Sequence, residues 1–352
     1  MRRGTIVGFV GFCVALLTLG SPVLAADEMR VSGPIGHDNL AIYFVHGSAG
    51  KSVVPASLAV ALASGRVKVR ETGTVNELTV ENVGDDEVFI QAGDIVKGGR
   101  QDRVLSVDLL LPPRSGQVSI AAFCVESGRW SARGGEDARQ FSAAGSAMPS
   151  HDAKVAMRAY MAAAPSSGAE RPNSADPSRS DTGSRQQQIW ASVKKTQDQL
   201  ARSVGAPVAA PASPSSLQLS LENEKLKAAQ DGYMLAVQGR SLDDDVVGYV
   251  VAINGKISGG DTYASPILFR QMWPKLLAAS VTEAISQKNA QEATPPSAET
   301  VLAFLKAAES APESERVLNS SARLATRDGD GLLFAETRRA PGAWVHRNYL
   351  AK

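Results

Sequence analysis

The chain has 352 residues, 43% of them hydrophobic, which is enough for one large folded domain or two ordinary ones. Its formal net charge is +1 at pH 7, with 37 Lys and Arg against 36 Asp and Glu. This balance argues against a nucleic-acid binder, because such proteins normally carry a strongly basic face or domain.

The first 25 residues have the pattern of a signal peptide. Arg2 and Arg3 precede an apolar run that is too short to span a bilayer comfortably, and small residues around Ala25 offer a cleavage site. Cleavage changes the net charge to −1 and discards Cys13, so the remaining Cys124 has no partner for an intramolecular disulfide. We expect an extracytoplasmic protein, periplasmic or secreted, without stable membrane insertion and without a nucleic-acid partner.

The first organised region is expected to be rich in strands. Strands are expected at 39–45 and 66–71, on either side of a short helix that ends at Gly65. From Glu77 onward, apolar runs separated by turn residues indicate an antiparallel meander. Its strands are expected at 77–83, 87–93, 104–111 and 118–126.

The composition changes after the meander. Residues 162–184 are mostly Ala, Ser, Pro, Gly, Arg and Asp, and residues 205–216 are similar. Such segments cannot bury enough apolar surface to offset the entropy lost on ordering, so we expect a disordered insert and a second flexible stretch. Between them, residues 184–204 have the period of an amphipathic helix.

The second organised region is expected to combine helices and strands. A helix at 220–238 precedes two strands that meet at Asn254-Gly255, a pair typical of a tight hairpin. Ser265 and Pro266 suit the cap and first turn of the next helix, which Pro274 should kink or split. Two more strands end the chain. Together these elements predict an α+β fold, with an antiparallel β-meander or sandwich-like core flanked by helices, in one composite domain over residues 26–350.

Several short motifs are interpreted as ordinary structure. HGSAGKS, from His46 to Ser52, lacks the first glycine of a phosphate-binding loop, because Val45 stands there. The segments 327–331 and 243–245 fit a turn and a solvated charge run. The four histidines lack the spacing of metal ligands, and we expect no metal site and no cofactor. They are His37, His46, His151 and His346, the last of which we interpret as a strand residue.

The most informative stretch is Gly93–Leu105, a charged loop between two apolar runs. If the strand 104–111 returns as 118–126, positions whose numbers sum to about 229 lie opposite each other. Arg103 then lies beside Glu126, and Arg100 lies near Arg129. This register predicts a rim of neighbouring residues, namely Asp94, Lys97, Gly98, Gly99, Arg100, Gln101, Arg103, Glu126, Arg129 and Trp130.

Three interpretations of this rim stay open. It could bind a small anionic or sugar-like ligand, since arginines grip carboxylate or phosphate, glycines admit close approach and Trp130 could stack on a ring. It could belong to a hydrolase of a phosphate- or glycoside-containing substrate, with Glu126 or Asp94 as acid or base. It could also be a structural corner of paired charges. Cys124 lies on a strand that is apolar on both faces and is interpreted as an inert core thiol.

The pairing of GDIVKGGRQDRVL with FCVESGRW resembles the ARG and rhodanese-phosphatase-superfamily-associated protein domain family. That family has a similar G-G-x-Q-x-R loop and a C-V-E-x-G-R-W strand end. Weaker similarities, at 54–69, 186–195 and 250–277, extend the resemblance over roughly residues 32–349. The resemblance implies no activity. The family's association with ADP-ribosylglycohydrolases implies at most a link to NAD- or ADP-ribose-type metabolism.

Overall fold

The computed structural model describes residues 29–48, 50, 53–133, 136–163, 177–239, 242–289 and 293–352. The signal peptide expected at residues 1–25 lies outside the described residues, as does the central part of the insert expected at 162–184. The flanks of that insert belong to helices, which end at Ala163 and begin at Pro177.

The described strands form three sheets. The largest contains, in spatial order, β1 (Arg30–His37), β2 (Leu40–His46), β12 (Val246–Ile253), β13 (Lys256–Tyr263), β17 (Trp344–Ala351), β16 (Leu332–Arg339), β15 (Ala322–Gly329) and β14 (Glu313–Asn319). The second contains β11 (Phe141–Ala143), β7 (Ile95–Gly98), β8 (Arg103–Leu105), β10 (Gly116–Cys124), β5 (Glu77–Asn82) and β4 (Val67–Glu71). The third contains β3 (Ala56–Ser57), β6 (Val88–Ile90) and β9 (Leu109–Leu111).

The helices flank these sheets, and apart from the parallel pair β3 and β6 the paired strands are antiparallel. The α+β fold with a strand-rich core, predicted from the sequence, is therefore confirmed. The helices are α1 (Leu58–Ala63), α2 (His151–Ala163), α3 (Pro177–Val204), α4 (Leu217–Leu221), α5 (Glu224–Gln238), α6 (Pro266–Ser286) and α7 (Ala298–Ser310). None of the helices in the described residues is both long and apolar enough to cross a membrane.

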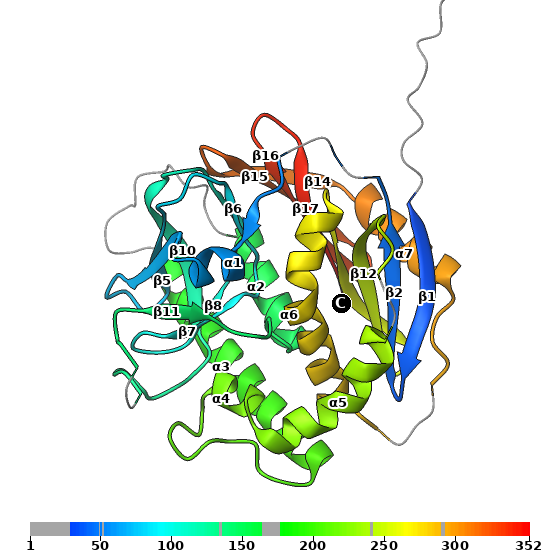
Figure 1. The fold of residues 1–352 in the computed structure, drawn as a ribbon, viewed down its shortest axis with the longest axis horizontal. Helices are drawn as coiled ribbons and strands as arrows, with labels where there is room; N and C mark the ends of the chain where they lie inside the picture. Colours follow the sequence, from blue (N-terminus) through cyan, green and yellow to red (C-terminus); the bar gives the residue numbers. More distant parts are fainter. Residues whose placement is uncertain are drawn as a thin grey trace, which may run out of the picture.

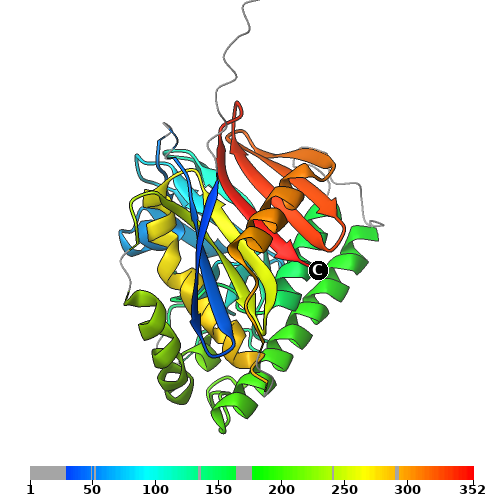
Figure 2. The same ribbon diagram turned by 90° about the vertical axis from the view of Figure 1, so that its right-hand side faces the viewer.

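Helix α6 runs through the middle of the molecule, between the six-stranded and the eight-stranded sheets (Figure 1). It is buried on nearly all sides, as expected for a helix that is apolar all round. The largest core cluster joins α6 to the inner face of the eight-stranded sheet and to the six-stranded side, for example through Ile42, Phe269 and Phe123. Helix α7 packs on the outer face of the large sheet (Figure 2).

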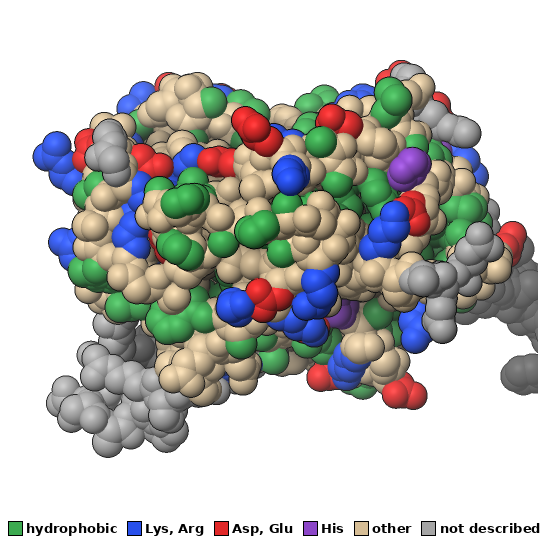
Figure 3. Space-filling model, turned by 90° about the horizontal axis from the view of Figure 1, so that it is seen from below, with side chains coloured by type: hydrophobic (Ala, Val, Ile, Leu, Met, Phe, Trp, Pro, Cys, Tyr) green, Lys and Arg blue, Asp and Glu red, His purple; other side chains and the backbone are tan. Residues whose placement is uncertain are grey.

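The surface seen from below, near α3, α4 and α5, carries no single-sign patch among the described residues. Basic, acidic and hydrophobic side chains are interspersed there (Figure 3).

Several local elements follow the sequence signals. Asn254 and Gly255 both have positive φ (50° and 74°) and join β12 to β13 in the expected hairpin. Ser265 caps α6 by accepting hydrogen bonds from the backbone of Ile267 and Leu268. Pro274 lies inside α6 without splitting it.

The prediction of one strand at 104–111 is wrong, because these residues belong to two strands, β8 and β9, which lie in different sheets. β8 pairs with β10, whereas β9 pairs with β6. The chain leaves the six-stranded sheet at Ser106, whose hydroxyl donates a hydrogen bond to the backbone oxygen of Ala121. The buried Asp108 lies two residues further on. The paired positions of β8 and β10 place Arg103 opposite Cys124, so the predicted register is also wrong by two residues.

The stretch 205–216, for which composition predicts flexibility, is a loop that touches the core through few side chains. Val208 is 1% exposed and Ser213 is 5% exposed. The burial of these two side chains cannot be predicted from the composition of the stretch as a whole.

Candidate functional site

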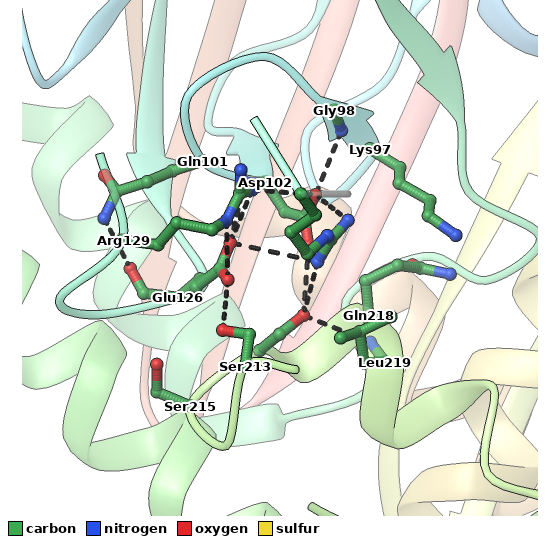
Figure 4. Close-up of polar contacts among 12 residues, drawn as sticks. Lys97, Gly98, Gln101, Asp102, Glu126, Arg129, Ser213, Ser215, Gln218 and Leu219 are labelled. Carbon is green, nitrogen blue, oxygen red and sulfur yellow. Dashed lines mark hydrogen bonds and ion pairs between the residues drawn. The ribbon is translucent and has the colours of Figure 1, made fainter. Parts of the chain in front are cut away.

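The glycine-arginine loop forms a charged corner whose buried groups pair mainly with one another (Figure 4). Glu126 is fully buried and accepts hydrogen bonds from Arg129 Nε (2.8 Å) and from the hydroxyl of Ser213. Asp102, which the sequence analysis did not single out, is also fully buried. Arg133 binds its two carboxylate oxygens at 2.7 and 2.9 Å.

The expected ion pair between Arg103 and Glu126 is not formed. Arg103 is fully buried and donates from Nη1 to the backbone and side-chain oxygens of Gln101 at 3.3 and 3.2 Å. Its Nη2 lies 3.4 Å from Glu71 Oε2. The prediction is wrong because β10 places Cys124, rather than Glu126, opposite Arg103. Gln101 links the two groups instead, since its Nε2 donates to the backbone oxygen of Glu126 (3.2 Å).

Two residues of the predicted rim point elsewhere. Asp94 is buried and pairs with Lys275 of α6. Lys97 Nζ contacts both carboxylate oxygens of Glu222, at 2.7 and 3.0 Å. Asp94 is thus bound to α6 and not to the corner. Lys97 stays next to the corner, because the backbone N–H of the following Gly98 donates to Asp102 at 3.0 Å.

The two glycines of the loop serve the close packing of β7 on β11. Gly98 and Gly99 have φ of 120° and 60°. A Cβ atom at Gly98 would overlap the backbone oxygen of Gln140, and one at Gly99 would overlap the ring of Phe141. These positions therefore require glycine for backbone geometry.

Arg100 and Trp130 form the exposed part of the corner. Trp130 is 44% exposed. The guanidinium carbons of Arg100 and Arg103 lie 5.5 and 5.7 Å from the centre of its ring. Cys124 is fully buried, and burial raises the pKa of its thiol to about 11. The thiol is therefore protonated at neutral pH, as its interpretation as an inert core residue requires.

A second polar site, which the sequence analysis missed, lies between the eight-stranded sheet and helices α2 and α6. It surrounds a cavity of ≈ 50 Å³. The polar residues that line the cavity include Gln91, Lys154, Arg158, Tyr249, Ser258, Asp261 and Asn348.

The floor of the cavity is the segment Ser258–Asp261 of β13. Gly259 pairs with Val251 and Ile257 pairs with Ala252, so Ser258 is the additional residue of a β-bulge. In a regular strand Ser258 and Asp261 would face opposite sides, but a bulge re-aims the side chains next to it. Both consequently line the cavity, together with the two glycines between them.

Asp261 belongs to a buried network centred on His346 of β17. His346 Nδ1 lies 2.6 Å from Asp108 Oδ2, and its Nε2 lies 3.0 Å from Asp261 Oδ1. Burial alone would lower the pKa of His346, but the two carboxylates outweigh burial and raise this pKa to about 9. Burial likewise opposes ionisation of Asp108, yet His346 and Arg158 lower its pKa to about 2. The histidine is therefore a doubly protonated imidazolium between two carboxylates at neutral pH.

Arg158 reaches the same cavity from α2. Its side chain is 9% exposed, and Nη2 donates to Asn348 Oδ1 at 2.6 Å. Among the described residues, no carboxylate lies within 4 Å of its guanidinium nitrogens. Burial lowers the pKa of Arg158, and the more distant charges of Asp108 and Asp261 oppose this effect. A guanidinium has five N–H donors, and Arg158 uses one of them in the bond to Asn348. Most of its donors therefore have no partner among the described residues.

Ser258 lies between a carboxylate and an imidazole. Its hydroxyl donates to Glu283 Oε1 at 2.6 Å and lies 3.3 Å from His151 Nδ1. Glu283 is fully buried, and Lys154 Nζ contacts its other oxygen at 2.7 Å. Burial lowers the pKa of His151, which keeps its ring neutral at pH 7.

One group of described residues has side chains placed to hold a metal ion, namely His46, Asp243 and Asp245. His46 Nδ1 contacts Asp245 at 2.8 Å and its Nε2 lies 2.7 Å from the hydroxyl of Ser32. Both ring nitrogens are thus already hydrogen-bonded within the protein, and these bonds explain the group without an ion.

A sequence signal for the cavity exists. Asp261, His346 and Asn348 are polar residues on strands in the interior of the sheet, where a buried charge needs a partner. The sequence does not reveal that these strands are neighbours.

The comparisons with known proteins give one match. A family model for the ARG and Rhodanese-Phosphatase-superfamily-associated Protein domain matches residues 28–350. No curated protein and no solved structure matches the chain. The matched range includes both the charged corner and the cavity, and it confirms the resemblance found in the sequence.

Proposed function

The chain belongs to the ARG and Rhodanese-Phosphatase-superfamily-associated Protein domain family, whose name indicates no ligand. We propose a function from the residues that line the cavity. The domain binds a small anionic ligand, and Arg158 holds its carboxylate or phosphate group. The observation that carries this proposal is a guanidinium that is nine-tenths buried, lines the cavity and has one hydrogen bond among the described residues.

The energetics favour an oxyanion as the partner of Arg158. A buried polar group without a hydrogen-bond partner costs free energy, and a charged group costs more. A carboxylate or phosphate can accept two parallel hydrogen bonds from a guanidinium. Asp261 lines the same cavity and can accept a hydrogen bond from a ligand hydroxyl, so a hydroxy acid or a sugar acid would satisfy both residues.

The size of the cavity limits the ligand. A volume of ≈ 50 Å³ corresponds to on the order of four water molecules, which is also the scale of one acid group. The acid group would therefore enter the cavity while the remainder of the ligand extends toward its opening.

Binding is tested by calorimetry and thermal shift with a panel of small carboxylates, sugar acids and sugar phosphates. We expect at least one to bind the full chain and raise its melting temperature. Arg158→Gln should weaken that binding on the order of 10- to 100-fold, because a hydrogen bond between charged groups is lost.

Arg139 supplies the matched control, since its side chain is 90% exposed and pairs only with Asp137 among the described residues. Arg139→Gln should bind as the parent does. Failure of every acid to bind, or equal binding by the parent and Arg158→Gln, would refute the proposal.

A second candidate is an anionic ligand at the exposed part of the charged corner. It is supported by Arg100 and Trp130, which are exposed to solvent and form a cation–π contact with each other. Trp130→Ala would abolish binding there and leave binding in the cavity unchanged, so the same panel separates the two sites. The buried pairs around Asp102 and Glu126 instead support a structural role.

A further inference from the structure

We infer that Ser258 is a nucleophile and that the cavity hydrolyses an ester of a small anionic acid through a covalent acyl-Ser258 intermediate. The substrate class rests on the proposed function, because Arg158 supplies the binding of the acid group. The nucleophile itself rests on the geometry around Ser258.

The first support is the backbone. Ser258 is the additional residue of a bulge in an interior strand, and its side chain lines a cavity. Bulges are frequent next to active sites because they re-aim a side chain. The two glycines that follow cannot be replaced without overlap. A Cβ at Gly259 would meet the backbone oxygen of Tyr349, and one at Gly260 would meet that of Tyr249.

The second support is the pair of acceptors around the hydroxyl. A serine hydroxyl is a weak nucleophile until a base takes its proton, and the base must lie within hydrogen-bond reach. Glu283 Oε1 meets that condition at 2.6 Å, and His151 Nδ1 lies 3.3 Å away. Lys154 Nζ contacts the other carboxylate oxygen of Glu283 at 2.7 Å, so Oε1 remains free to accept the proton of the hydroxyl.

The third support is a comparison with other serines of the chain. Ser119 also donates to a carboxylate, that of Glu77, but it lies on an exposed strand face and does not line the cavity. Ser213 donates to Glu126 within the charged corner. A serine–carboxylate contact alone is therefore common in this protein, and Ser258 differs by its bulge, its cavity and the neighbouring cations.

The reaction needs only the ester and water. Ser258 Oγ bonds to the ester carbonyl carbon while its proton moves to Glu283. The bond to the leaving alcohol then breaks, and the alcohol departs with that proton. Water next gives a proton to Glu283 and bonds to the acyl carbon. The bond to Ser258 breaks, Ser258 regains the proton, and the free acid leaves.

The nucleophile is tested by treating the full chain with a small alkyl fluorophosphonate and measuring the intact mass. We expect one label per chain, which peptide mapping places on Ser258. Ser258→Ala should remain unlabelled, whereas the matched control Ser119→Ala should be labelled as the parent is. Absence of a label on the parent chain, or a label on another residue, would overturn the inference.

Hydrolysis is tested with the mono-4-nitrophenyl ester of succinate, followed by release of nitrophenol. Ser258→Ala should lose at least about 10³-fold in kcat, as expected for removal of a nucleophile. Arg158→Gln should mainly raise KM. Binding of free succinate to Ser258→Ala, with an unchanged melting temperature, shows that this variant folds.

The two proposals fail separately. If Ser258→Ala hydrolyses the ester as fast as the parent, Ser258 is not the nucleophile, while anion binding by Arg158 still stands. If the label reaches Ser258 but no anion binds and Arg158→Gln leaves KM unchanged, the proposed ligand is wrong and the nucleophile stands.

Discussion

The buried His346 predicts that the protein loses stability in mildly alkaline solution. The pKa of His346 is about 9 in the folded chain, against 6.5 for an ordinary histidine. A pKa raised by folding stabilises the folded state below the unfolded pKa, and this contribution disappears as the pH rises through the folded pKa. From these two pKa values, the contribution is about 3 kcal/mol below pH 6 and less than about 0.5 kcal/mol above pH 9.

The assay is denaturant unfolding at intervals between pH 6 and pH 9.5, a range below the titration of the buried tyrosines. Their pKa values are raised by burial, as for Tyr263. The free energy of unfolding of the parent should fall by about 2–3 kcal/mol over this range. His346→Gln should be less stable at pH 6 and should lack most of this pH-dependent fall, because its side chain does not titrate.

The exposed His37 gives the control, since His37→Gln leaves the network of His346, Asp108 and Asp261 intact. Its stability should fall with pH as that of the parent does. An equal fall in His346→Gln and the parent would show that His346 is not held as an imidazolium, and the account of the network would be wrong.

Three further predictions concern other parts of the chain. Arg133→Ala should destabilise by about 3–5 kcal/mol in urea unfolding, because it leaves Asp102 buried without its bidentate partner, whereas the exposed Arg139→Ala should change stability by less than about 0.5 kcal/mol. Gly260→Ala should reduce the melting temperature, since its Cβ would overlap backbone in the neighbouring strand, and an unchanged value would contradict that packing. Intact mass of the exported protein should place its N-terminus at Ala26 or the next residue; an uncleaved cytosolic chain would contradict export.

Sequence reasoning predicted the features that short segments specify. The hairpin at Asn254-Gly255 and the cap at Ser265 depend on local backbone conformation, and both are present. The prediction of one strand at 104–111 failed because Asp108, in the middle of this range, pairs with a residue that is far away in sequence. Asp108 turns inward to meet His346, which lies 238 residues further along the chain.

For the candidate sites too, sequence reasoning found what neighbouring residues specify and missed what depends on distant contacts. The loop and strand end around Glu126 were recognised because their residues are close in sequence, although the register was two residues off. His346 was correctly assigned to a strand, but its function as the centre of a network depends on β13 and β17 being neighbours. A bulge at Ser258 has no signal in the sequence beyond the two glycines, because it is defined by the pairing of strands.

The position of α2 has a consequence for how the protein could be assembled. Arg158 and Lys154 lie before the insert at 162–184, whereas Ser258, Asp261 and His346 lie after it. Helices α2 and α3, which flank the insert, each supply residues to one core cluster, including Met157 and Ile189. Two polypeptides divided within the insert would each carry an incomplete cavity, and their reassociation would restore it. The domain is therefore suited to fragment complementation, in which ligand binding reports that the two pieces have met.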